Sequence, residues 1–126
     1  MPELNLELGQ KGEQLAAAFL KSRGYNIVET NYHTRLGQID IIAKDKRTIC
    51  FVEVKTRKTQ EFGHPAEAID SCKQRKISQV ALTFLKEKGF LNYPARFDIV
   101  LISYPDIEPK IELLRNAFEL DYHYLY

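Results

Sequence analysis

Two acidic residues and one lysine lie in or directly after segments that are otherwise apolar except for Gln38. Asp40 interrupts the run 37–43, and Glu53 and Lys55 follow the apolar run Ile49-Cys50-Phe51-Val52. Because alternate side chains of a strand share a face, Glu53 and Lys55 point the same way. Two neighbouring carboxylates raise each other's proton affinity, and a divalent cation such as Mg²⁺ or Mn²⁺ relieves that repulsion. A lysine beside such a site can stabilise a phosphate or orient a water molecule.

A hairpin between these two segments would bring the three side chains together. Residues 37–43 and 48–55 predict two strands, and the polar four-residue loop between them has a length typical of an antiparallel hairpin. If pairing begins at the ends of that loop, Asp40 lies opposite Phe51 and diagonal to Glu53, on one face of the sheet. A loop longer or shorter by one residue would turn Asp40 to the other face.

The rest of the chain predicts helices and strands that would support this hairpin. Glycines end both predicted helices, and the last residues are rich in aromatic side chains. The pattern predicts one α/β domain over 1–126, with a mixed central sheet of about five strands flanked by helices and an aromatic C-terminal tail over 115–126. The predicted helices are 8–23 and 70–88, and the remaining predicted strands are 25–32, 96–103 and 110–114.

The second predicted helix carries a lysine at an unfavourable place. Counting back three or four residues from Ile77 gives Gln74 and Lys73, so both continue the inward-facing row of the helix. A positive charge in a first turn opposes the helix dipole, whereas a bound phosphate would be stabilised there and would offset the charge. The alternative is that Lys73 bends outward into solvent.

Composition limits the classes of partner. With 18 basic and 17 acidic residues the net charge is +1, so any phosphate-binding surface must come from local clusters such as 55–58 and 73–76. Each cluster is also compatible with an ordinary solvated surface. Two cysteines without metal-site spacing, no signal peptide and no long apolar stretch predict a cytoplasmic protein that does not enter a membrane.

The arrangement Asp40…Glu53-Val54-Lys55 resembles the PD-(D/E)xK nuclease core of restriction endonucleases and archaeal Holliday-junction resolvases. The wider pattern resembles the small bacterial YraN-like family, which is considered nuclease-like from its fold, and the resemblance covers nearly the whole chain. One position departs from that family's usual Gly-Glu-Ile-Asp, because Gln38 stands where the glutamate is expected and supplies no negative charge. The matching segments are Gly12-Glu13, Ala16-Ala17, Leu20, Gly24-Tyr25, Asn31-Tyr32, Arg35, 37–43, 51–57, Phe62-Gly63, Pro65, Ala68-Ile69, Lys73, Lys76-Ile77, Arg96-Phe97-Asp98 and Asn116-Ala117-Phe118.

The resemblance implies a restriction-endonuclease-like fold and metal-dependent hydrolysis of phosphodiester bonds in nucleic acid, with structure-specific DNA expected rather than RNA. Asp40, Glu53 and the Val54 carbonyl would hold Mg²⁺ or Mn²⁺, Glu13 would add a ligand, and Lys55 would orient the attacking water. Resolvase-like relatives are dimers, which implies a homodimer. The residues expected to contact phosphates are Arg35, Arg57, Lys73, Gln74 and Lys76.

Two other functions stay open from the sequence. The first is a nucleic-acid-binding module that keeps the nuclease fold with little or no catalysis, which Gln38 and the near-zero net charge favour. The second is an interaction protein that acts through its aromatic tail.

Overall fold

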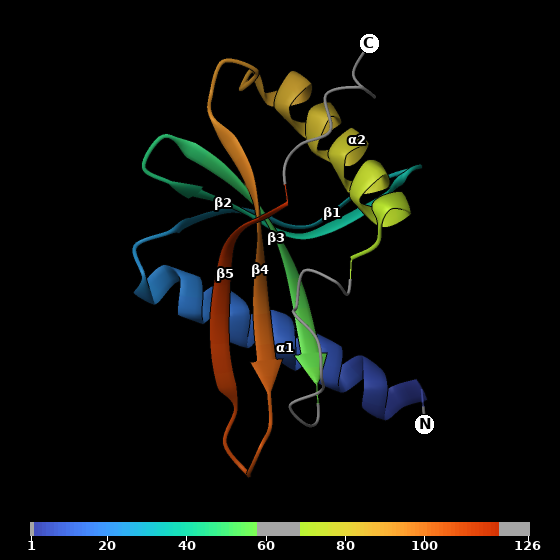
Figure 1. Cartoon of the computed structure of the whole chain (residues 1–126), viewed down its shortest axis with the longest axis vertical. Helices are drawn as coiled ribbons and strands as arrows, with labels where there is room; N and C mark the ends of the chain where they lie inside the picture. Colours follow the sequence, from blue (N-terminus) through green and yellow to red (C-terminus); the bar gives the residue numbers. More distant parts are fainter. Residues whose placement is uncertain (1, 58–68, 119–126) are drawn as a thin grey trace.

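A computed structural model of the chain describes residues 2–57 and 69–118. Within these residues one five-stranded sheet has the order β1-β2-β3-β4-β5, in which β3 and β4 pair in parallel and the other neighbours pair antiparallel (Figure 1). The predicted mixed sheet flanked by helices is therefore confirmed. The elements are α1 (Pro2–Ser22), β1 (Asn26–Thr34), β2 (Gly37–Asp45), β3 (Thr48–Arg57), α2 (Ser71–Lys88), β4 (Ala95–Ser103) and β5 (Lys110–Phe118).

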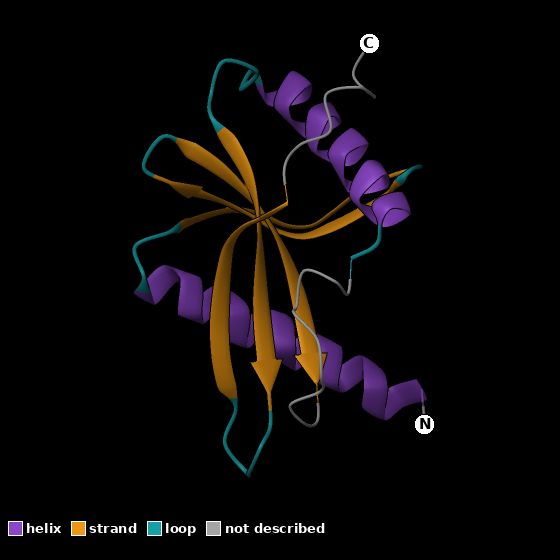
Figure 2. Ribbon diagram, viewed as in Figure 1, coloured by secondary structure: helices purple, strands orange, loops and turns teal. Residues whose placement is uncertain are grey.

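The two helices cover opposite faces of this twisted sheet (Figure 2). On one face Phe84 of α2 packs against Phe51 of β3 in an edge-to-face arrangement, with ring centroids 6.0 Å apart. On the other face Leu20 of α1 lies in a core cluster with Val52. Successive residues of β3 therefore alternate between the α2 face and the α1 face, as in any strand. Glu53 and Lys55 continue the row of Phe51, on the α2 face.

Helix α2 begins and ends close to the predicted positions. Asp70 is its N-cap, and the Asp70 side chain accepts the backbone N–H of Lys73 at 2.8 Å. Gly89 ends the helix with φ 72°, a left-handed conformation that glycine adopts at low cost. The apolar stripe expected from the sequence is buried throughout: Ile77, Val80, Ala81, Phe84 and Leu85.

The hairpin between β2 and β3 is tighter than the sequence predicts. The strands continue through Asp45 and from Thr48, so two residues form the turn, and Lys46 there has φ 57°. The predicted four-residue loop is wrong, and Ile41 pairs with Val52 rather than with Cys50. The register moves by two residues, so the side chains of the paired residues, such as Ile41 and Val52, stay on their predicted faces.

The last strand is longer than predicted, because a bulge lets it continue past Leu114. Asn116 has φ 53°, and its N–H donates to the buried carboxylate of Asp98 at 2.9 Å. Phe118 then stacks on Phe97, with centroids 4.5 Å apart. The predicted tail over 115–126 is therefore wrong at its start, and 119–126 lies outside the described residues. In the described part of the chain no helix has both the length and the apolarity needed to cross a bilayer.

Candidate active site

The candidate site lies where β2 separates from β3. The pairing of these strands ends at Ile41 with Val52, whereas β2 stays paired with β1 as far as Gly37. Ile39 and Ile42 both face α2, so the regular alternation of side chains is broken between them. The break falls at Asp40, and the β1 residue across from it, Asn31, has φ 52°. This bend opens a gap between the first residues of β2 and the last residues of β3.

The carboxylate of Asp40 replaces a backbone hydrogen bond that β2 and β3 no longer make beyond Ile41 and Val52. Its Oδ2 accepts the backbone N–H of Val54 at 2.8 Å, and its Oδ1 accepts a long hydrogen bond of 3.4 Å from Gln38 Nε2. In a strand the N–H and the C=O of one residue point to the same side. The Val54 carbonyl therefore also faces the gap, as a metal-binding carbonyl must.

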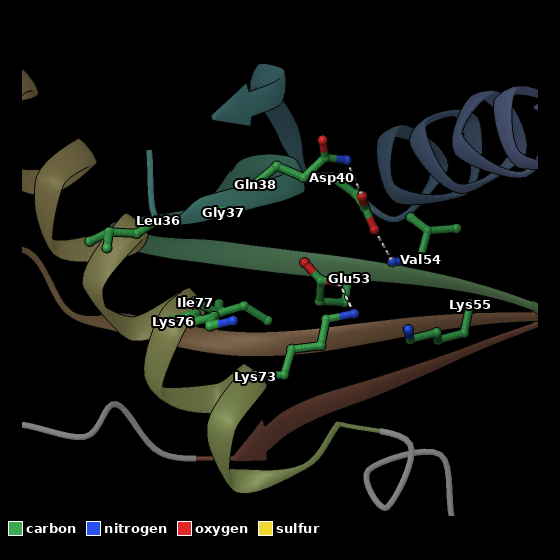
Figure 3. Close-up of a pocket in the computed structure, with 10 residues that line it drawn as sticks. All are labelled: Leu36, Gly37, Gln38, Asp40, Glu53, Val54, Lys55, Lys73, Lys76 and Ile77. Carbon is green, nitrogen blue, oxygen red and sulfur yellow. Dashed lines mark hydrogen bonds and ion pairs between the residues drawn. The ribbon is translucent and has the colours of Figure 1, made fainter. Parts of the chain in front are cut away.

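A cleft of about 440 Å³ occupies this gap, between the split strands and the first turns of α2 (Figure 3). The predicted catalytic side chains Asp40, Glu53 and Lys55 all line it. Figure 3 shows that they come from both sides of the split, with Lys73 reaching towards Glu53 from α2. The full lining is Leu36, Gly37, Gln38, Asp40, Glu53, Val54, Lys55, Lys73, Lys76 and Ile77.

Glu53 is the most strongly perturbed group of the cleft. It is 5% exposed, its Oε2 lies 3.5 Å from Lys73 Nζ, and its Oε1 is buried with no hydrogen-bond partner among the described residues. Burial, followed by the charge of Asp40, raises the Glu53 pKa to about 7, although Lys73 and Lys55 oppose the shift. A buried oxygen without a partner costs free energy, which a bound cation would recover.

The two lysines beside Glu53 have opposite shifts. Burial, together with contact with the Lys73 amine, lowers the pKa of Lys55. Burial acts in the same direction on Lys73, but contact with Lys55 and attraction to Glu53 and Asp40 outweigh it, and the Lys73 pKa is raised. Lys55 therefore loses a proton more easily than an ordinary lysine, and Lys73 loses one less easily.

The donor set fits a hard divalent cation. Within the described residues no three His, Cys, Asp or Glu side chains gather closely enough to form a cage around a metal ion. A cation here would take Asp40, Glu53 and the Val54 carbonyl and complete its shell with water or phosphate oxygen. Mg²⁺ is usually bound in this way, whereas structural zinc requires four protein ligands.

The structure does not bring Glu13 into the cleft. Glu13 projects from α1, whose Ala16 and Leu20 pack on the face of the sheet opposite α2. It lines a separate hollow of about 270 Å³ with Gln10, Gln14, Ala17, Thr30 and Asn31. The resemblance implied a metal-ligand role for Glu13, but the sequence could not show which face of the sheet its helix covers.

The predicted phosphate contacts divide into two groups. Lys73 and Lys76 line the cleft; the helix pattern predicted an inward position for Lys73, whereas Lys76 was expected from the charge cluster 73–76 and the resemblance. Gln74 does not: its Nε2 donates to the Ile69 carbonyl at 2.9 Å and fixes the chain before α2. Arg35 lies in the exposed turn between β1 and β2, and Arg57 ends β3 without lining the cleft.

Leu36 is a cleft residue that the sequence analysis did not consider. Leu36 lines the cleft at the turn between β1 and β2 and is 50% exposed. The available signal was an apolar residue in a short polar turn, directly after Arg35 and before Gly37. Turns favour Gly, Asn, Asp, Pro and Ser, so a leucine there is atypical.

A second group of charges lies outside the cleft and has a structural role. Arg96 Nε donates to both carboxylate oxygens of Asp98, at 3.0 and 3.1 Å, and Arg96 Nη2 donates to Asp45 and to the Tyr25 hydroxyl. Asp98 is fully buried and also holds the bulge at Asn116. This network joins β2, β4 and β5.

Comparison with known proteins places the chain in one family. Residues 12–102 match the family described as "Uncharacterised protein family UPF0102". A UPF0102 protein of Syntrophus aciditrophicus is 48% identical over 118 residues, covering 94% of this chain and 93% of that protein. UPF0102 proteins of Geotalea uraniireducens and Desulfosudis oleivorans are 49% and 50% identical over 119 and 113 residues, covering 94% and 90% of both chains. The chain therefore belongs to the UPF0102 family.

Proposed function

We propose that this chain is a metal-dependent nuclease with a PD-(D/E)xK-type active site that hydrolyses phosphodiester bonds of nucleic acid. The observation that carries the proposal is Glu53: a nearly buried carboxylate with one oxygen unpartnered, next to Asp40 and Lys55 at a strand split. A carboxyl group with its pKa raised to about 7 in a cleft is a functional-site signature. A purely structural glutamate would carry a partner on each oxygen.

Each cleft residue has a role in this proposal. Asp40, Glu53 and the Val54 carbonyl would hold Mg²⁺ or Mn²⁺, which would polarise the phosphate and acidify a bound water. Lys55, with its lowered pKa, orients the water and donates to the charge that develops on the phosphate. Lys73 and Lys76 supply positive charge for the flanking phosphates.

The substrate in this proposal is structure-specific DNA rather than RNA. Three lysines in the cleft provide local attraction although the net charge is only +1. None of the described elements resembles a base-reading module, which favours recognition by shape. A homodimer and a cytoplasmic location belong to the same proposal, and the free thiols of Cys50 and Cys72 fit a reducing compartment.

Cleavage assays on linear, flapped and branched DNA with Mg²⁺, Mn²⁺ or EDTA test this function. We expect metal-dependent cleavage that falls by about 100-fold or more in Lys55→Met. Lys46→Met, in the exposed turn between β2 and β3, is the matched control and should cleave as the wild type does. Equal cleavage by wild type and Lys55→Met would remove Lys55 from the active site.

A binding module without catalysis is the second candidate, and two observations favour it. Gln38 places a neutral amide in the cleft, and the Lys73 ammonium already neutralises Glu53 in the absence of a metal ion. This candidate predicts no cleavage in any metal, together with DNA binding that weakens as salt rises. Lys76→Ala should then weaken binding to all DNA structures to a similar extent.

A further inference from the structure

The turn between β1 and β2 presents an apolar side chain at the entrance to the candidate site. Leu36 is half exposed and lines the same cleft as Asp40 and Glu53. Figure 3 shows it at one end of the cleft, with Lys55 at the other. Single exposed leucines on a surface usually need no explanation. A leucine next to a cleft lined by three lysines and two carboxylates is different, because it offers an apolar contact, which those charged groups cannot make.

The turn is held in place through contacts of β1. The Leu36 N–H donates to Thr34 Oγ1 at 3.1 Å within the turn. Further along β1, the Tyr32 hydroxyl donates to Glu87 at 2.9 Å, and the Tyr32 ring packs edge-on against Phe84 of α2, 5.3 Å between centroids. Leu36 is therefore carried by a hairpin that is fastened to α2.

The depth of the cleft limits what can reach the carboxylates. Glu53 is 5% exposed, and the cavity of about 440 Å³ is in the range of pockets for small ligands. A space of this size favours one or two nucleotides of an unpaired strand over the full width of a duplex.

We propose that Leu36 is a wedge that packs on the last base pair of a duplex, at the point where an unpaired strand leaves it and enters the cleft. The inference rests on the proposed nuclease function and narrows its substrate to nucleic acid with a flap or fork. Apolar side chains, leucine among them, are used to pack on or between base steps. Arg35 beside Leu36 in the turn, and Lys76 in the cleft, lie where the flanking phosphates would pass.

A purely structural role for Leu36 predicts something else. Leu36 and the buried Ile77 both line the cleft, so the leucine could simply cover the edge of the core. In that case a polar substitution lowers the melting temperature and lowers kcat/KM and binding affinity equally for every substrate. Loss of a wedge lowers kcat/KM and affinity for flapped DNA more than for single-stranded DNA of the same sequence.

The test compares kcat/KM and binding affinity for a flapped duplex and for the single strand alone, in Leu36→Ser, Leu36→Met and Leu91→Ser. Leu91 is the matched control because it is 55% exposed, lies in the connection between α2 and β4, and does not line the cleft. We expect the flap-to-single-strand ratio to fall roughly tenfold in Leu36→Ser, the effect of losing one modest apolar contact. Leu36→Met should restore the ratio, and Leu91→Ser should keep it.

A 2-aminopurine base at the last pair of the flapped duplex gives a readout that does not depend on cleavage. Its fluorescence should change on binding of wild type and Leu91→Ser but not of Leu36→Ser. An unchanged ratio and an unchanged fluorescence response in Leu36→Ser would overturn the wedge while leaving the nuclease proposal intact. A wild type that changes the fluorescence but cleaves no DNA would support the wedge and contradict the nuclease proposal.

Discussion

The carboxylate of Asp40 accepts the backbone N–H of Val54 at 2.8 Å, at the point where the pairing of β2 with β3 has ended. One side chain thereby supports the split between the strands and faces the cleft that the split creates. Because the same residue holds the backbone and lines the site, its structural and chemical roles can be separated by choice of substitution.

Asp40→Ala should lower the free energy of unfolding by about 1–2 kcal/mol, because the partly buried Val54 N–H loses its acceptor. Asp40→Asn should lose less, since an amide oxygen can still accept. Urea denaturation at pH 5 checks this. Asp106→Ala, in the exposed connection between β4 and β5, should change little. Equal losses in Asp40→Ala and Asp40→Asn would show that the hydrogen bond contributes no stability.

The buried Glu53 carboxyl should make stability depend on pH. Its pKa is about 7 in the folded chain against an ordinary value of 4.5, so the folded state binds more protons between these values. Stability must then fall as pH rises from about 4.5 to about 7. Relative to wild type, Glu53→Gln should gain roughly 2 kcal/mol between pH 5 and pH 8. Urea denaturation in EDTA at both pH values measures this, and a constant difference would contradict it.

Lys73 and a metal ion should compete for Glu53. The Lys73 ammonium lies 3.5 Å from Glu53 Oε2, so a cation that binds there must displace it. Lys73→Met should tighten Mn²⁺ binding by about tenfold, the effect of removing roughly 1.4 kcal/mol of competing attraction. The same variant should weaken DNA binding. Isothermal titration calorimetry with MnCl₂ measures the first effect, and Lys88→Met in the last turn of α2 is the control. Weaker Mn²⁺ binding in Lys73→Met would contradict the competition.

Asp98→Ala should destabilise the fold without altering the cleft. Asp98 is fully buried and accepts from Arg96 and from the Asn116 N–H, so its removal leaves both donors short of a partner. We expect a loss of about 3 kcal/mol in urea denaturation. Mn²⁺ affinity measured below the unfolding transition should not change. A loss of Mn²⁺ affinity in the folded variant would contradict this prediction, because it would show that the Arg96–Asp98 network supports the metal site. Glu112→Ala breaks an exposed ion pair with Lys110 and should have little effect.

The alternation of side chains explains how much of the site was predictable. Strand parity put Glu53 and Lys55 on one face, and the helix pattern put Lys73 on the inward-facing row of its helix; the structure brings all three to the cleft. The predicted register was wrong by two residues, but a shift by two preserves the face of every paired residue, and only the break at Asp40 puts Ile39 on the other face. The error arose because Lys46 adopts a left-handed conformation, for which a lysine gives no signal.

The remaining features depend on contacts between distant parts of the chain. The bend at Asp40 involves Asn31 on another strand, and the sequence does not reveal their alignment. The position of Glu13 depends on which face of the sheet α1 covers, which helix periodicity does not determine. The bulge at Asn116 depends on the buried carboxylate of Asp98, so the length of β5 could not be read from its own residues.

Single-turnover cleavage of a flapped DNA in Mn²⁺, by wild type, Asp40→Asn and Asp106→Asn, tests the central claim most directly. Asp40→Asn keeps an acceptor for the Val54 N–H but removes the negative charge from the proposed metal site. We predict cleavage by wild type and Asp106→Asn, and a loss of about 100-fold or more in Asp40→Asn. Cleavage by Asp40→Asn at the wild-type rate, or cleavage that persists in EDTA, would contradict the metal-dependent site at Asp40 and Glu53.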